Sequence, residues 1–211
     1  MRILLLNPPF QGRRYSRTSR SPAVTKSGTL YYPMWLAYAA GVLEKEGFET
    51  RLIDGPARGL LDEDIINILK DYRPDLVVID TSTPSIYSDV KIAELVKEKA
   101  KGSFVILVGT HPSSLPEETL RLSESIDAVA RGEYDYTIRD LAETLRSGRQ
   151  LKSVSGISFR DGVGIIHNEK RTLIEDLDKI PFVSSVYKRH LRVADYFFAA
   201  SFYPLAMIIS G

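Results

Sequence analysis

Apolar runs that alternate with stretches of helical spacing constrain this chain more than any other feature. Short, continuous apolar runs are typical of strands buried on both faces, and between them apolar residues recur every three to four positions. We expect strands at 3–6, 51–53, 76–79, 104–108 and 128–130, and helices at 34–46, 60–72, 85–101, 116–123 and 134–146. Crossover helices of this length connect parallel strands. The pattern therefore predicts an α/β fold with a Rossmann-like, doubly wound, parallel five-stranded sheet.

The pattern changes near residue 148. Alternating apolar residues flank Asp161-Gly162, a dipeptide typical of tight hairpins. A polar linker follows, and the last segment, "PLAMIISG" (204–211), has the composition of a buried strand. We therefore divide the chain into a Rossmann-like domain (1–148), a β-hairpin extension (149–175), and a linker that ends in one further strand (176–211).

Composition argues against several classes of function. Lysine and arginine number 28 against 27 aspartate and glutamate, so no global field attracts nucleic acid. No apolar run approaches the roughly 20 residues of a membrane-spanning helix. We therefore expect no nucleic-acid partner, no membrane span and a cytoplasmic location. The sequence has no cysteine, so an iron–sulfur cluster bound by thiolates would have to lie outside these residues.

The segments that follow the predicted strands share an unusual composition. Ligands of open parallel sheets bind at the carboxyl ends of the strands, and here those ends carry "NPPF", "DTSTPS", "GTHPS" and "RGEYD". Glycine, hydroxyl groups and proline dominate, with few acid–base groups, which favours holding a large ligand over attacking a substrate. Neither a G-x-G-x-x-G nor a P-loop motif occurs. The first segment also lacks the acidic pair of a phosphoacceptor receiver.

Several segments resemble, in the same order, the amino-terminal half of cobalamin-dependent radical SAM enzymes, in the branch of the anaerobic magnesium-protoporphyrin cyclase and the phosphonate methylases. They are "LLLNPPF", "YYPMWLAYAAGVLEKEGFETRLID", "VVIDTSTPSIYSDVKIAELVKE", "VILVGTHPSSLPEETL", "IDAVARGEYDYTIRDLAETL" and "IEDLDKIPF". The resemblance implies a cobalamin-binding domain, a linker and the first barrel strand, truncated before the cysteine motif that binds the iron–sulfur cluster and S-adenosylmethionine. Such a fragment binds cobalamin without catalysis, and its partner is the radical SAM barrel of the same polypeptide. The full enzyme would carry out methyl transfer or a radical rearrangement or cyclisation.

The resemblance also implies which residues contact the cofactor. They are Asn7, Pro8 and Pro9 after the first strand; Thr81, Ser82, Thr83, Pro84 and Ser85 after the third; Gly109, Thr110, His111 and Pro112 after the fourth; and Gly132 and Glu133 after the fifth. Small hydroxyl residues would let the corrin approach closely, so we expect Thr83 and Ser85 to face the crevice. Ser82 or Thr83 also suits the cap of the helix that begins near Ser85, with Pro84 in its first turn.

The lower face of the cobalt is a separate question. Cobalamin carriers that supply a histidine to cobalt have an Asp-x-His-x-x-Gly motif after the first strand, whereas this sequence has "NPPFQG". Of the three histidines, only His111 lies in a ligand-side segment, where packing or hydrogen bonding near the corrin is its expected role. We therefore expect base-off cobalamin with no protein histidine ligand, and no metal ligand in this chain.

Other features leave alternatives open. The basic residues after the first strand either hold an anionic group or lie in a solvated loop; they are Arg13, Arg14, Arg17 and Arg20. The aromatic residues before the first helix either wall the cofactor or pack into the core; they are Tyr31, Tyr32 and Trp35. The alternative function is a stand-alone, flavodoxin-like module for a small ligand or nucleotide.

Overall fold

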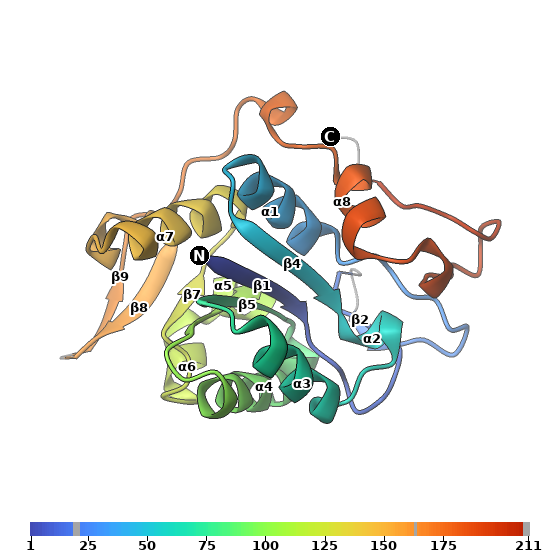
Figure 1. Ribbon diagram of the computed structural model, residues 1–211, viewed down its shortest axis with the longest axis horizontal. Coiled ribbons are helices and arrows are strands. Elements are labelled where there is room, and N and C mark those ends of the chain that lie inside the picture. The colour runs from blue at the N-terminus through green and yellow to red at the C-terminus, as the bar shows by residue number, and fades with distance from the viewer. Residues whose placement is uncertain (19–21, 163, 209–211) are drawn as a thin grey trace.

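A computed structural model describes residues 1–18, 22–162 and 164–208 (Figure 1). Its strands are β1 (Arg2–Asn7), β2 (Tyr15–Ser16), β3 (Ala23–Val24), β4 (Glu49–Asp54), β5 (Leu76–Thr81), β6 (Phe104–Gly109), β7 (Ala128–Ala130), β8 (Ile157–Asp161) and β9 (Gly164–His167). Its α-helices are α1 (Met34–Lys45), α2 (Gly55–Arg58), α3 (Asp62–Tyr72), α4 (Ile86–Lys99), α5 (Thr110–Ser114), α6 (Pro116–Arg121), α7 (Asp135–Ser147) and α8 (Val183–His190). Every helix and strand that the periodicity predicted within residues 1–148 is present.

The main sheet has seven strands in the order β4-β1-β5-β6-β7-β8-β9. The strands from β4 to β7 are parallel, which confirms the predicted doubly wound sheet. The hairpin also forms at Asp161-Gly162, but it is not a separate ribbon. Its first strand pairs antiparallel with β7, with Ala128 opposite Phe159. This pairing satisfies the free edge of β7 and buries Ile157 and Phe159, so the sheet gains two strands.

Helices cover both faces of the sheet. Helices α1, α7 and α8 pack on one face, and α3, α4 and α6 pack on the other (Figure 1). The strands alternate accordingly: Ile3 and Leu5 belong to the first layer, whereas Leu4 and Leu6 belong to the second. Because both faces are covered, the strands read as continuous apolar runs rather than as alternating ones.

The strand order places a topological switch between β1 and β5. The chain leaves β1 toward α1 on one face of the sheet, and it leaves β5 toward α4 on the opposite face. At such a point the two connections diverge and open a crevice at the carboxyl ends of the strands, where ligands of this architecture bind. The crevice position follows from topology alone.

Three local features differ from the sequence-based expectation. The β2–β3 ribbon was not predicted, because two residues per strand show no periodicity. The segment "THPSS" forms α5, with Pro112 in the first turn, where proline is tolerated. The expected last strand is absent from residues 205–208, which pair with no strand in the structure. Residues 209–211 of that prediction lie outside the described part.

Among the described residues, no helix is long and apolar enough to cross a membrane.

Candidate cofactor site

The loops after β5, β6 and β7 form one continuous rim at the carboxyl edge of the sheet. The Nδ1 atom of His111 lies 3.3 Å from the Thr83 hydroxyl and ties the first loop to the second. Ser113 ties the second loop to the third, because its hydroxyl donates to the Gly109 carbonyl at 2.7 Å and accepts from the Gly132 amide at 3.1 Å. We call these three loops the rim; it comprises residues 81–85, 109–113 and 132–134.

The predicted cofactor residues divide into exposed and covered groups. Thr83, Pro84, Thr110, Gly132 and Glu133 are exposed on the rim, and Gly109 is half-buried. Asn7, Pro8, Pro9, Thr81, Ser82, Ser85, His111 and Pro112 are buried. The structure thus brings the residues of the β5, β6 and β7 loops together at one accessible surface. The residues after β1 lie beneath other parts of the chain.

Gly109 lets the first two rim loops approach each other closely. Its φ of 110° and ψ of −167° belong to a region that only glycine occupies routinely. A Cβ atom here would lie 2.2 Å from the Thr81 carbonyl oxygen and 3.0 Å from Asp80 Oδ1. The glycine is therefore required by the packing of the β6 terminus against the β5 terminus.

Ser82 and Ser85 form a reciprocal cap at the start of the helical segment after β5. The Ser82 amide donates to Ser85 Oγ at 3.2 Å, and the two hydroxyls lie 2.8 Å apart. Ser82 is thus the N-cap residue of the turn Thr83–Ser85 that leads into α4. Ser85 also donates to Asp89 Oδ2 at 2.6 Å and is only 1% exposed, so the expectation that it faces the crevice is wrong. Thr83 alone of the expected pair is exposed.

Arg17 fills the crevice between β1 and β5. Its guanidinium pairs with Asp89 of α4 at 2.5 Å, and both side chains are at most 1% exposed. The same group donates to Asn7 Oδ1 and to the Pro8 carbonyl, each at 2.8 Å. Arg17 is thus a buried structural cation, which neither alternative for the basic segment anticipated. A signal existed in Asp89, because a carboxylate between Ile86 and Val90 on a buried helix face needs a partner.

The other arginines of the basic segment and the aromatic residues near the start of α1 lie partly in the core and partly at the surface. Arg13 and Arg14 are exposed, and Arg14 donates to the Asp195 carbonyl. Arg20 lies outside the described residues. Tyr32 is fully buried in the core, Tyr31 is half-buried, and Trp35 is 46% exposed at the start of α1. Core packing therefore accounts for Tyr32, whereas Trp35 stays available at the carboxyl edge.

Three buried carboxyl groups at this edge share the single guanidinium of Arg17. Asp89 contacts it directly, while Asp80 and Asp54 interact with it at longer range. Burial raises the pKa of Asp80 to about 7, with the charges of Asp89 and Asp54 adding to the rise. Burial likewise raises the pKa of Asp54 to about 6, against hydrogen bonds from Tyr196, Ala57 and Asn7 that lower it. Burial also raises the pKa of Asp89, so each of the three carboxyl groups holds a proton more readily than an ordinary aspartate.

The raised pKa of Asp80 predicts that the stability of the fold declines as pH rises. Its pKa rises from a usual 3.8 to about 7 on folding, so the protonated form stabilises the fold at low pH and this stability is lost as pH rises through 7. The loss is on the order of 4 kcal/mol. We expect urea denaturation between about pH 4 and pH 8 to show this decline. Asp80→Asn, which mimics the protonated acid, should flatten it.

The control for this experiment is Asp178→Asn, because Asp178 is exposed. Asp54, Asp89 and Asp135 have pKa values shifted in the same direction, so a residual slope is expected in Asp80→Asn. If wild type and Asp80→Asn lose free energy of unfolding in parallel over this pH range, Asp80 is ionised in the folded state and our assignment of the proton is wrong.

Two buried polar atoms at the rim have no hydrogen-bond partner among the described residues. They are Nε2 of His111 and the hydroxyl of Tyr134. Burial lowers the pKa of His111, so its ring is neutral. Tyr134 was missed by sequence reasoning, although it directly follows the predicted Gly132-Glu133. Unsatisfied buried groups are rare in folded proteins, and Arg131, Arg160 and Tyr187 carry further ones outside the rim.

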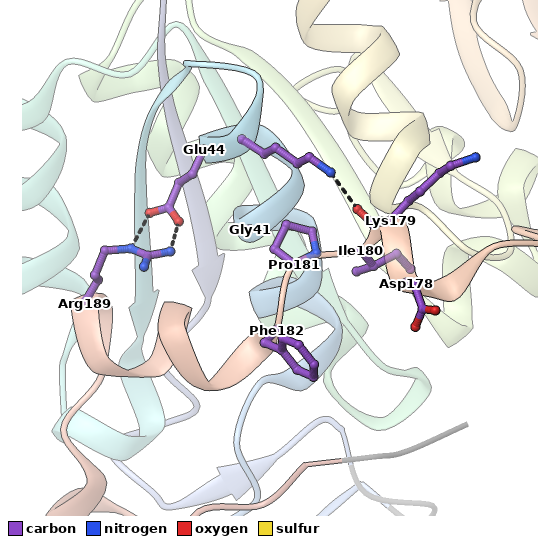
Figure 2. Close-up of a pocket in the computed structure, with 9 residues that line it drawn as sticks. Gly41, Glu44, Asp178, Lys179, Ile180, Pro181, Phe182 and Arg189 are labelled. Atoms are coloured by element: carbon purple, nitrogen blue, oxygen red, sulfur yellow. Dashed lines mark hydrogen bonds and ion pairs between the residues drawn. The ribbon is translucent and has the colours of Figure 1, made fainter.

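A surface groove of about 660 Å³ lies elsewhere, between α1 and α8 (Figure 2). Its lining residues are Gly41, Glu44, Lys45, Asp178, Lys179, Ile180, Pro181, Phe182 and Arg189. Helix α1 begins at the carboxyl edge of the sheet and ends at Lys45, so this groove is at the opposite end of the helix from the rim. Its Glu44 is already paired with Arg189 and His190. The groove therefore does not belong to the candidate site.

Comparisons with known proteins identify the family of this chain. The family described as the B12 binding domain matches residues 20–142, more than half of the chain. An uncharacterised methyltransferase of Pyrococcus horikoshii is 34% identical over 184 residues, covering 87% of this chain and 38% of that protein. The anaerobic magnesium-protoporphyrin IX monomethyl ester cyclase of Cereibacter sphaeroides is 27% identical and is covered to 25% of its length. The chain thus spans between a quarter and two fifths of these two relatives.

Solved structures show the same fold. The cobalamin-dependent S-adenosylmethionine radical enzyme OxsB with aqua-cobalamin bound matches with a TM-score of 0.67 and 22% identity, over 82% of this chain and 22% of that one. The radical S-adenosylmethionine methyltransferase TsrM of Kitasatospora setae, with cobalamin and a [4Fe-4S] cluster bound, matches with a TM-score of 0.62 and 19% identity, over 85% of this chain and 30% of that one. These matches do not favour a stand-alone nucleotide-binding module. The chain belongs to the family of B12-binding domains and resembles the cobalamin-binding part of radical S-adenosylmethionine methyltransferases.

Proposed function

We propose that this chain holds cobalamin on the rim of the β5, β6 and β7 loops, as the cofactor domain of a longer radical SAM enzyme. The match to the B12-binding family carries the proposal. The rim supports it, because four of its exposed residues are small or compact and leave room for a macrocycle: Thr83, Pro84, Thr110 and Gly132. The fifth, Glu133, is long and charged. Cobalamin, when bound, supplies a cobalt that transfers a methyl group or takes part in radical chemistry.

The residues of the rim fit such a cofactor. The corrin ring carries carboxamide side chains, which both donate and accept hydrogen bonds. The neutral His111 ring and the Tyr134 hydroxyl, each with an unused polar atom, are suited to such amides. Gly109 keeps the β5 and β6 termini close together, and Thr83 offers a hydroxyl without bulk. The buried Asn7, Pro8 and Pro9 would shape the site from beneath.

The cobalt is expected to be base-off with no protein imidazole. The loop after β1, where histidine-on carriers place their ligand, has no histidine, and Nε2 of His111, the ring nitrogen that Thr83 leaves unused, is buried. We expect the electron paramagnetic resonance spectrum of the Co(II) form to show no nitrogen superhyperfine splitting from an axial imidazole. A three-line splitting that disappears in His111→Ala would make His111 a ligand and contradict this expectation.

The segment after the hairpin suggests a partner in the same polypeptide. Large apolar side chains are exposed at Leu173, Leu177, Phe182, Val193, Phe197, Phe202, Tyr203 and Ile208. Eight large exposed apolar side chains in one stretch of the chain favour a surface that a partner covers. We propose that residues 176–211 lead into a radical SAM barrel, which would bind the iron–sulfur cluster and S-adenosylmethionine, while 1–148 and 149–175 form the cofactor domain and its extension. The cytoplasmic location stays a prediction.

Enlarging Thr83 tests the proposed site. Thr83→Phe adds a ring at an exposed position on the rim and removes only a 3.3 Å contact with His111, so the fold should survive with a loss within about 1 kcal/mol. The ring would occupy space needed by the corrin. We expect the variant to retain hydroxocobalamin at least tenfold less well than wild type, measured by absorbance after gel filtration.

The matched control is Thr172→Phe, the same substitution at an exposed position outside the rim. It should bind cobalamin as wild type does. Equal retention by Thr83→Phe and wild type would show that the rim does not face the cofactor. A wild-type chain that takes up no cobalamin would overturn the proposed function itself.

A further inference from the structure

The linker after α8 is held against the segment that follows β1. The Leu30 amide donates to the Phe197 carbonyl at 2.7 Å, and the Ala199 amide donates to the Thr29 hydroxyl at 3.2 Å. The Tyr32 hydroxyl donates to the Leu205 carbonyl at 2.8 Å. Residues 195–205, the part of the 176–211 linker that 'the linker' denotes from here on, are thus anchored to residues 29–32 by hydrogen bonds between parts of the chain that are far apart in sequence.

Aromatic stacking adds to this anchor. Tyr32 lies between two other tyrosines, with its ring centroid 4.4 Å from that of Tyr187 and 3.7 Å from that of Tyr196. All three are buried. The stack therefore connects α8, the start of α1 and the linker, and it fixes where the Tyr196 hydroxyl lies.

That hydroxyl contacts the carboxyl edge of the sheet. Tyr196 donates to Asp54 Oδ2 at 2.8 Å, at the end of β4. The other oxygen of Asp54 accepts from Asn7 Nδ2 at 2.9 Å and from the Ala57 amide at 3.2 Å. Asp54 is fully buried. Each of its oxygens therefore binds a different structural unit, the linker on one side and the end of β1 on the other.

The hydrogen bonds continue from Asn7 to the rim. Asn7 Oδ1 accepts from Arg17, which pairs with Asp89. Asp89 accepts from Ser85, whose hydroxyl contacts that of Ser82 on the loop after β5. An unbroken series of buried contacts thus joins the linker to the rim. Buried polar networks of this kind have few alternative arrangements, because any unmade bond leaves a desolvated group without a partner.

We propose that Asp54 is a positioning residue that couples cofactor binding at the rim to docking of the linker through Tyr196. The proposal rests on the proposed function, because cobalamin is the ligand whose binding is coupled. The two states are a docked linker, as in this structure, and a released one in which Tyr196 has left Asp54. Ligand binding that favours the docked state must, by reciprocity, be weakened when docking is weakened.

Tyr196→Phe tests the coupling, because it keeps the aromatic stack and removes only the hydroxyl. We expect the variant of the 211-residue chain to bind hydroxocobalamin about tenfold more weakly than wild type, although Tyr196 is outside the rim. In hydrogen–deuterium exchange, cobalamin should slow exchange of residues 195–205 in wild type and have little effect in the variant. Asp54→Asn combined with Tyr196→Phe should bind as Asp54→Asn alone does, since both act through one contact.

Tyr203→Phe is the matched control. Tyr203 lies in the same linker, but its hydroxyl donates to the Ala194 carbonyl and not to Asp54. The Tyr203→Phe variant should bind hydroxocobalamin as tightly as wild type does. If wild type binds cobalamin and Tyr196→Phe binds it equally well, the coupling is disproved while the proposed function stands. If wild type binds no cobalamin, the proposed function fails and the coupling with it.

Discussion

Gly109→Ala is expected to lower the free energy of unfolding by roughly 4 kcal/mol or more. The backbone conformation at Gly109 costs a non-glycine residue about 1 to 3 kcal/mol. The added Cβ would also lie 2.2 Å from the Thr81 carbonyl oxygen, a backbone atom that cannot move without shifting the end of β5. Steric overlap therefore adds to the conformational strain. Urea denaturation followed by circular dichroism measures the loss.

Gly148→Ala is the matched control, at the end of α7. Its φ of 66° is also positive, but a Cβ there would meet no atom within 4 Å. Only the left-handed conformation would cost energy, about 1 kcal/mol. Two equal losses would show that the termini of β5 and β6 tolerate separation, and the close approach at the rim would then not be required for the fold.

Removal of the Arg17 guanidinium is expected to have a comparable effect. Arg17→Met leaves the fully buried Asp89 without its cation, and breaking a buried ion pair from one side costs about 3 to 5 kcal/mol. Adding Asp89→Leu should recover most of the loss, because an apolar pair of similar volume replaces both charges. Denaturation of the wild type and of both variants gives the three free energies.

An exposed ion pair provides the control for this prediction. Arg121 and Glu117 form a pair on α6 with side chains 70% and 51% exposed. Arg121→Met should change stability by no more than about 0.5 kcal/mol, because solvent already screens the pair. A loss below about 1 kcal/mol for Arg17→Met would mean that water reaches Asp89, and the crevice between β1 and β5 would be open rather than filled.

The two predictions concern different halves of the carboxyl edge. Gly109 belongs to the accessible rim, whereas Arg17 fills the topological switch between β1 and β5. Ligands of this architecture bind at the switch point, and here the chain places its own guanidinium there. This distribution supports a cofactor position displaced toward the β5, β6 and β7 loops.

The sequence by itself determined the strands, the helices, their alternation and the hairpin. These features depend on local rules: the period of apolar residues, the turn preference of Asp161-Gly162, and the steric freedom of glycine. The same rules located the loops at the carboxyl ends of the parallel strands, which contain Thr83 and Gly132. The cofactor was inferred from the resemblance to a family, because the period of apolar residues does not indicate which ligand binds.

Only the tertiary structure decided which polar side chains are open to a ligand. Ser85 and Thr83 are two residues apart in the same loop, yet Ser85 is buried against Asp89 while Thr83 is exposed. Arg17 looked like its exposed neighbours Arg13 and Arg14, and its role depends on Asp89, 72 residues away. Tyr196 meets Asp54 across 142 residues. Such pairings form between groups that are far apart in sequence and become buried together only when the chain folds. Local sequence patterns therefore do not predict them.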